Sequence, residues 1–163
     1  MTVISDTTPI ISLIKIQKLD LLQNLFKEIL IPDAVFKELT TNTVYKEEAE
    51  IVKNCDFFRT VSVQNKKSLE IFQKITGLDA GESEAIIIVD EQKSDLLIMD
   101  ERKGRKIAGK LGINLTGTIG ILIQAYNEKM ITAEDVKLCL QNLRQQNIRI
   151  SEELMNRAFE KLQ

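Results

Sequence analysis

The stretch VISDTTP, residues 3–9, decides how the fold begins and raises the first question about function. The preceding Thr2 and residues 3–5 are short, apolar and β-branched, which predicts a buried strand over 2–5. Pro9 suits the first turn of a helix, where no backbone N–H is needed, and Thr7 or Thr8 can cap that helix. Asp6 then ends the strand, at the edge where open α/β sheets bind ligands. Asp6 is either a helix cap or turn residue, or a metal ligand.

The rest of the chain continues this alternation of strand and helix. Apolar or alternating runs predict further strands over 29–32, 58–63, 96–99 and 113–117. Helical spacing of Leu and Ile predicts helices between them, and Asp33 can cap the helix after the second strand. Thr132 and Ser151 open two further helices, each with an acid within three residues. This order predicts an α/β fold, a three-layer α/β/α sandwich with a mostly parallel central sheet.

Length and composition indicate one globular domain. The 163 residues are enough to bury a core, and 44% apolar and 28% charged residues are typical of such proteins. We interpret 1–163 as a single domain, with an α/β core over 1–130 and a helical C-terminal extension over 131–163. No apolar run approaches the roughly 20 residues of a membrane span, and no secretory leader is recognisable. We therefore expect a cytoplasmic protein without a membrane partner.

The chain contains no histidine, which excludes His-based triads and His-ligated zinc. Cys55 and Cys139 are far apart and are interpreted as buried thiols. Polar chemistry must then rest on carboxylates, Lys, Arg, Ser or Thr. If a metal is bound, hard oxygen ligands favour Mg²⁺ or Mn²⁺. Because the net charge is −2, contact with nucleic acid would need a local basic patch.

Four acids interrupt otherwise buried segments. Asp100 ends the 96–99 strand as Asp6 ends the first, and the carboxyl ends of parallel strands meet at one edge. Glu38 lies in the short helix after 29–32, and Glu82 begins the most buried helix. Converging carboxylates raise each other's pKa values and destabilise the fold, and a divalent cation removes that cost.

Each acid also has a plainer interpretation. Asp6 and Asp100 could be cap or turn residues, Glu38 a solvated helix residue, and Glu82 a charge that complements the helix dipole. The set of four is more persuasive than any member, and at this point both interpretations stay open.

A basic stretch follows Asp100 directly. A helix that starts beside a metal site would aim some of its cations at a phosphate backbone, and it would equally serve as the solvated face of an amphipathic helix. The cations concerned are Lys103, Arg105, Lys106 and Lys110. Thr116 and Thr118 lie near the same edge, where they either bind phosphate or, as we favour, cap the next helix.

These motifs resemble the PIN domain family of small metal-dependent ribonucleases, over nearly the whole chain from VISDTTPIISL to TGTIGILIQA. VISDTT is similar to the family's strand that ends in Asp followed by Thr or Ser. IPDAVFKEL is similar to its Pro and short helix with Glu-Leu. The family's last two acids lie about 18 residues apart, as Glu82 and Asp100 do, which favours Glu82 over Glu84 as the third acid.

The resemblance implies that Asp6, Glu38, Glu82 and Asp100 are the catalytic residues that bind Mg²⁺ or Mn²⁺. It implies that Thr8 orients the first acid or a bound water. The chain departs from the family where Glu replaces the usual third Asp, and where LIMDERKGR, with Glu101 after Asp100, replaces Thr-x-Asp. In this it resembles a PIN subgroup with GExEA and DExxGR motifs. Glu84, Glu101 and Thr118 are expected to support the site.

The function implied is endoribonuclease activity, in which metal-activated water cuts a phosphodiester and leaves a 5′-phosphate and a 3′-hydroxyl. Many relatives are VapC-type toxins of toxin–antitoxin pairs, so the likeness implies RNA, a small antitoxin protein and a second copy of the chain as partners. A non-catalytic PIN-like binding module is the alternative, against which the four acids argue. A phospho-receiver domain is disfavoured because SDTT and LTGT stand where paired acids and Lys are needed.

Overall fold

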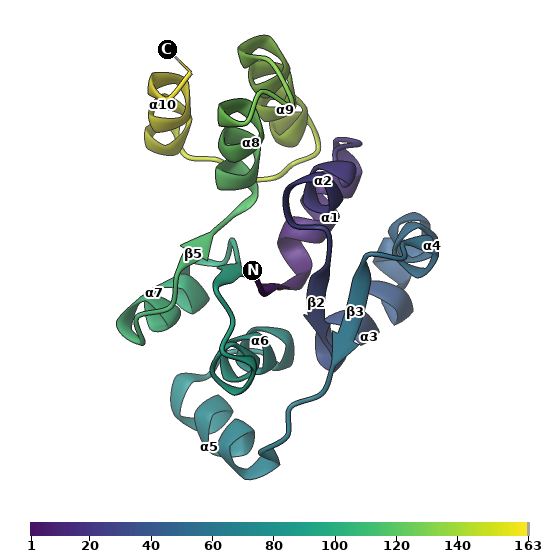
Figure 1. The fold of residues 1–163 in the computed structure, drawn as a ribbon, viewed down its shortest axis with the longest axis vertical. Coiled ribbons are helices and arrows are strands. Elements are labelled where there is room, and N and C mark those ends of the chain that lie inside the picture. Colours follow the sequence, from purple (N-terminus) through teal and green to yellow (C-terminus); the bar gives the residue numbers. More distant parts are fainter. Residues whose placement is uncertain (163) are drawn as a thin grey trace.

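The computed structural model describes residues 1–162, which form an α/β sandwich around one parallel sheet (Figure 1). The five strands of this part of the chain are β1 (Val3–Ser5), β2 (Ile29–Pro32), β3 (Phe58–Val61), β4 (Leu96–Ile98) and β5 (Leu115–Thr116). Their spatial order is β3-β2-β1-β4-β5, and every pair is parallel. The expected fold class is confirmed.

Helices connect the strands and follow the last one. They are α1 (Thr7–Lys15), α2 (Asp20–Phe26), α3 (Asp33–Thr41), α4 (Lys46–Asn54), α5 (Lys66–Thr76), α6 (Ala80–Gln92), α7 (Arg102–Lys110), α8 (Thr118–Asn127), α9 (Ala133–Gln145) and α10 (Glu152–Glu160). A short 3₁₀ turn, Thr43–Tyr45, precedes α4. Each helix was expected from the sequence, whereas the 3₁₀ turn was not.

The two faces of the sheet carry separate apolar clusters, because neighbouring residues of a strand point to opposite faces. Ile4 pairs in register with Leu97, and both pack with residues of α5, α6 and α7. Val3 and Ile98 lie in the other cluster, with residues of α1–α4 and α8–α10. A parallel sheet covered on both faces needs apolar residues at nearly every strand position, as this sequence has.

The strand order reverses direction at β1. The chain moves from β1 to β2 and β3 on one side, and then returns to β4 and β5 on the other. The carboxyl ends of β1 and β4 therefore flank the switch point at which open α/β sheets leave a crevice. Asp6 directly follows β1, and its backbone N–H donates to the Ile98 carbonyl at 2.9 Å. Asp100 lies two residues beyond β4, at the same edge.

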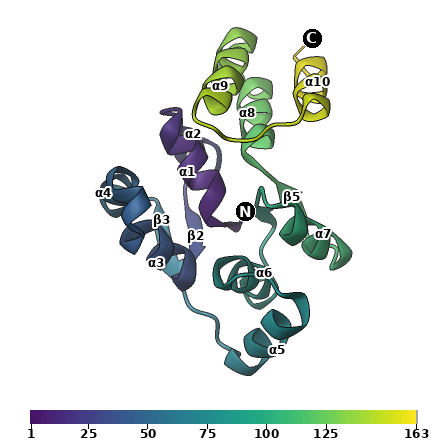
Figure 2. The ribbon, with the colours of Figure 1, turned by 180° about the vertical axis from the view of Figure 1, so that it is seen from behind.

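The C-terminal helices share the larger core. Leu140 and Leu143 of α9 and Met155 of α10 are buried in the cluster that also holds Leu13 and Leu22 of α1 and α2. Figures 1 and 2 show α8, α9 and α10 gathered at the end of the molecule opposite α5. Among residues 1–162, no helix has the length and apolar character to cross a membrane.

The helix caps differ from expectation at the first half of the chain. Thr132 and Ser151 are N-caps, as expected. Thr7 and Thr8 do not cap α1, because the helix starts at Thr7 itself. Asp33 does not cap α3 either: it is the first helical residue, and its carboxylate accepts a short hydrogen bond from the Ser62 hydroxyl.

Candidate functional site

Asp6 is a buried carboxylate with an unfavourable environment. Its side chain is 5% exposed. Burial is the largest cause that raises its pKa from 3.8 to about 7; the Thr7 backbone N–H lowers it in part, and the charges of Asp79, Glu82 and Glu38 raise it again. A shift of this size at a strand end is typical of functional sites. Without a counter-charge, burial and the neighbouring acids favour the protonated form of Asp6 far more than in an exposed aspartate.

Glu38 reaches the site from α3 and is held by a threonine. The Thr7 hydroxyl donates a hydrogen bond of 2.9 Å to a Glu38 carboxylate oxygen. This contact joins the first turn of α1 to α3. Glu38 is half-buried, and its charge is one of those that bear on Asp6.

Glu82 and Asp79 are locked together at the start of α6. Asp79 accepts from the Glu82 backbone N–H at 2.8 Å, and Glu82 accepts from the Asp79 N–H at 3.2 Å, a capping box. Burial first, and then repulsion by Asp79, raise the pKa of Glu82. The cap thus fixes two carboxylates beside Asp6.

Asp79 was missed as a site residue by sequence reasoning. A side chain at Gly81 would place its Cβ 3.4 Å from a carboxylate oxygen of Asp6 and 3.7 Å from one of Asp79, so both acids flank this glycine. The D-x-x-E pattern over 79–82 is the signal that could have located it, because a capping box orients both of its acids.

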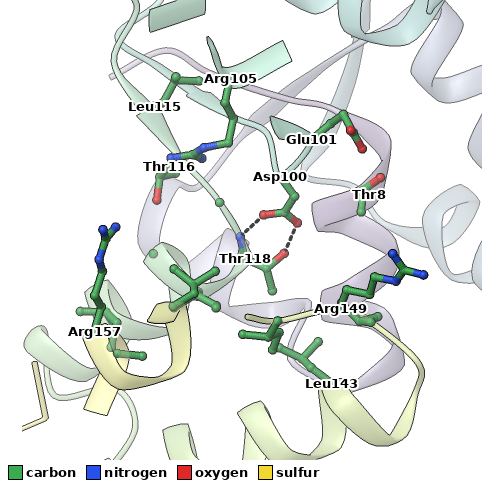
Figure 3. A pocket seen from close by; sticks show the side chains of 18 of the residues that line it. Thr8, Asp100, Glu101, Arg105, Leu115, Thr116, Thr118, Leu143, Arg149 and Arg157 are labelled. Atoms are coloured by element: carbon green, nitrogen blue, oxygen red, sulfur yellow. Dashed lines mark hydrogen bonds between the residues drawn. The ribbon is translucent and has the colours of Figure 1, made fainter. Parts of the chain in front are cut away.

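Thr118 holds the Asp100 carboxylate through two hydrogen bonds. The Thr118 backbone N–H donates to one carboxylate oxygen at 2.8 Å and its hydroxyl donates to the other at 2.5 Å (Figure 3). Thr118 is therefore not the N-cap that was favoured for α8, and of the two roles left open for Asp100 the cap of α7 is not observed. Glu101, with no side-chain capping bond, precedes α7, and Gly117 precedes α8. A Cβ at Gly117 would collide with the Asp100 carboxylate, so a side chain here would displace Asp100 from its bonds to Thr118.

A cleft of about 770 Å³ opens beside Asp100. Thr8, Glu101 and Arg105 line it together with Asp100 and Thr118, and residues of 148–161 form its far side. The structure thus brings Glu38 and Glu82 toward the charge of Asp6, and it places Asp100 in an open cleft at the neighbouring strand end.

The other expected residues take different positions. Glu84 is buried, accepts a long hydrogen bond of 3.4 Å from the Ala34 backbone N–H, and has a raised pKa because of burial. Arg105 donates to the Met99 carbonyl at 2.7 Å and lines the cleft. Lys103 is exposed and lies on the Glu82 side, where its charge lowers the pKa of that acid in part.

Lys106 and Lys110 complete the expected basic stretch. Both are exposed on α7, and neither is among the described residues that line the cleft. Of the four cations, Arg105 is therefore the one with a direct place beside Asp100.

The donor set fits a divalent cation in its chemistry. Carboxylate oxygens are the ligands that Mg²⁺ and Mn²⁺ prefer, and a cation would relieve the repulsion felt by the buried Asp6. With the side chains as they stand, no three acidic or cysteine residues within 1–162 form a group that could hold a metal ion. The acids at the switch point are thus brought near one another without forming a complete coordination shell.

Comparison with known families identifies the fold. A family model described as a PIN domain matches residues 2–163. The chain therefore belongs to the PIN domain family, as its motifs indicated. PIN domains are generally nucleases and typically use divalent metals, so the fold is of a nuclease type. No curated protein matches the chain.

Proposed function

We propose that the protein is an endoribonuclease that cuts RNA phosphodiester bonds with Mg²⁺ or Mn²⁺. The observation that carries this proposal is the buried Asp6 carboxylate, whose pKa is raised to about 7 by burial and by three neighbouring acids at the switch point of the sheet. In a protein without a cation site, such repulsion between carboxylates would only destabilise the fold. A cation site requires carboxylates that converge in this way. Membership of a family of nucleases supports the same conclusion.

Asp6, Glu38, Glu82 and Asp100 are the residues that would hold the ion. When bound, a divalent cation supplies Lewis-acid activation of a water molecule and charge stabilisation at the phosphate. Of the two acids in GESEA, Glu82 is favoured because its charge bears on Asp6, while Glu84 bonds to the start of α3.

Neighbouring groups position these carboxylates. Thr7 holds Glu38, and Thr118 holds both oxygens of Asp100. Residues of this kind keep a ligand in the orientation that binding requires. Arg105, fixed by the Met99 carbonyl at the edge of the cleft, is suited to bind a phosphate of the substrate.

The biological setting suggested by the family resemblance stays a prediction. It comprises a toxin role, a small antitoxin partner, a homodimer and a cytoplasmic location. The nuclease activity itself does not depend on these and can be tested with the purified chain.

The test is cleavage of a mixed single-stranded RNA pool with Mn²⁺, Mg²⁺ or a chelator. We expect metal-dependent cutting to 5′-phosphate ends, which Asp6→Asn and Asp100→Asn each lower by roughly a hundredfold or more. Asp90→Asn is the matched control, because Asp90 is exposed and its ion pair with Lys93 lies on the surface. Calorimetry with Mn²⁺ runs on the same samples. Metal binding that depends on Asp6 but yields no cutting would favour the non-catalytic binding module.

A further inference from the structure

The cleft beside Asp100 continues to the C-terminal helices, where it is lined by cations. Arg149 precedes α10, and Arg157 and Lys161 lie on or just after it; all three line the same cleft as Asp100 and Arg105. Figure 3 shows Arg105, Arg149 and Arg157 around the Asp100–Thr118 pair, from three different segments. In a chain of net charge −2, this is a local concentration of positive charge.

These cations are available to an anionic ligand. Among the described residues, Arg149 and Lys161 take part in no ion pair. Arg157 pairs with Glu153 at 2.6 Å, but the two side chains are 65% and 75% exposed. An exposed pair of this kind contributes little to stability, so the guanidinium can exchange its partner for a phosphate.

The floor of the cleft is aliphatic. Ile119 and Ile123 of α8, Leu143 of α9, and Ile148 and Ile150 of the connection to α10 line it. The partly exposed Ile119, Ile148 and Ile150 can pack against the apolar faces of unpaired bases, and the cationic rim can contact the phosphates of the same strand. A double helix hides its bases and would contact only the rim. The charge of the rim and the apolar floor together favour an unpaired strand.

We propose that the C-terminal extension is the wall on which single-stranded RNA binds, with Arg149, Arg157 and Lys161 contacting phosphates of the strand that reaches Asp100. This inference rests on the proposed nuclease function and adds to it the residues that bind the RNA strand at a distance from the cleavage site. Arg105 binds the phosphate of the strand that lies nearest to Asp100. The extension thereby contributes to substrate binding as well as to the core.

The test compares two triple variants of equal charge. Arg149→Gln/Arg157→Gln/Lys161→Gln removes the rim. Lys53→Gln/Lys74→Gln/Lys93→Gln removes three exposed lysines from other surfaces. Both are made in the Asp6→Asn background, so that RNA is not cut during the measurement. The affinity for a labelled 12-nucleotide single-stranded RNA of mixed sequence is measured by fluorescence anisotropy over a range of salt.

We expect the rim variant to bind about tenfold or more weakly and the control to change little. Each phosphate that a cation neutralises on a single strand releases roughly 0.7 counterions, so removal of three such cations should lower the salt slope by about 2 in the rim variant alone. If the affinity decreased equally in both variants, the change of net charge alone would explain the loss, and the proposal would be overturned. An unchanged affinity in both, or no RNA binding by the parent chain, would overturn it as well.

A second readout separates this proposal from the nuclease proposal. With Asp6 intact, hydrolysis of bis(p-nitrophenyl) phosphate in Mn²⁺ reports on the carboxylates without a bound strand, so the rim variant should lose less of this activity than of its cleavage of long RNA. On long RNA the rim variant should show a raised KM with an unchanged kcat. If no variant hydrolyses either substrate, the nuclease proposal fails while the anisotropy result still decides the binding wall. Hydrolysis of long RNA with equal KM in wild type and rim variant would overturn the wall alone.

Discussion

At the scale of single residues, the site is defined by Asp6, a carboxylate whose charge is destabilised by burial and by neighbouring acids. Asp6 is almost completely buried, and three acids lie close enough to act on its charge. The unfavourable charge of the Asp6 carboxylate is relieved when it takes up a proton or when it binds a cation. Proton and metal therefore compete for Asp6 near neutral pH, which makes the effect of pH on the metal-free protein informative.

Asp6→Asn should remove part of the pH dependence of the free energy of unfolding. The folded-state pKa of about 7 exceeds the ordinary 3.8, so the folded protein binds the proton more tightly, and stability falls as pH rises from about 4 to 7. At about 1.4 kcal/mol per pKa unit, the asparagine variant should be a few kcal/mol more stable than wild type at pH 8. Urea unfolding with chelator at pH 4.5, 6 and 8 measures this.

Two comparisons make the Asp6 result specific. Asp90→Asn should leave the pH profile of wild type unchanged, and a smaller slope should persist in Asp6→Asn because burial also raises the pKa values of Glu82 and Glu84. In Mn²⁺ the wild type should gain stability and Asp6→Asn should not. A stability difference that is the same at every pH would contradict the assigned environment of Asp6.

Thr118→Val should impair cleavage more than folding. The variant keeps the backbone hydrogen bond to Asp100 and loses the 2.5 Å bond from the hydroxyl. Removal of a group that orients a metal ligand typically costs about 10- to 100-fold in activity or metal affinity, whereas the missing hydrogen bond costs about 1 kcal/mol of stability. Thr118→Ser, which retains the hydroxyl, should restore both. An unchanged Mn²⁺ affinity in Thr118→Val would leave the threonine with a structural role only.

The threonines also mark the limit of sequence reasoning at this scale. Thr7 and Thr118 each stand where a helix cap is expected, and both instead donate to acids from another element. A sequence pattern reveals that a hydroxyl can cap a helix. It does not reveal that the Thr7 hydroxyl donates to the carboxylate of Glu38, which lies 31 residues away on another helix.

At the scale of elements, the agreement with the sequence is close where periodicity is strong. The strand over 29–32 has the observed bounds, and α6 is buried nearly all round, as its apolar middle predicts. The last strand is shorter than 113–117 and covers only Leu115–Thr116, because the chain turns at Gly117 toward α8. Element ends depend on the partners they meet, which local spacing does not contain.

Substitutions of Asp79 should separate its two roles at the start of α6. Asp79→Ala removes the side-chain acceptor of the capping box and should cost about 1 kcal/mol of stability. Asp79→Asn keeps an acceptor and removes a charge that raises the pKa of both Asp6 and Glu82. At pH 8 without metal, the asparagine variant should therefore be at least as stable as wild type. Chemical denaturation of the three proteins checks this order, and equal destabilisation of both variants would contradict it.

At the scale of the whole molecule, the sheet edge gathers residues that are remote in sequence. Asp6 and Asp100 lie at the same edge of the sheet because β1 and β4 are neighbours in the order β3-β2-β1-β4-β5. The alternation of strands and helices predicts a parallel sheet and a shared edge, and it leaves open which strands are adjacent. The cationic wall formed by Arg149 and Arg157 was not foreseen, because nothing in their own segment indicates that it faces Asp100.

The shared core predicts that the C-terminal helices and the α/β core unfold together. Leu140 of α9 is fully buried in the cluster that includes Leu13 and Leu22, so Leu140→Ala should cost about 2–5 kcal/mol. Leu138, on the same helix and 56% exposed, is the matched control, and its change to Ala should alter stability by less than about 0.5 kcal/mol.

Two probes can follow this unfolding in different parts of the chain. Circular dichroism reports on all helices, and tyrosine fluorescence reports on Tyr45 before α4 and Tyr126 in α8, since the chain has no tryptophan. In Leu140→Ala we expect both probes to shift to the same lower denaturant concentration in one transition, because a cavity in a shared core weakens every element packed on it. If an early partial transition preceded the main one, the extension would be a separate folding unit, and the Tyr126 signal would follow it because its hydroxyl donates to the Leu162 carbonyl. The residues proposed to bind RNA would then lie on helices that can unfold while the α/β core, which holds the carboxylates, stays folded.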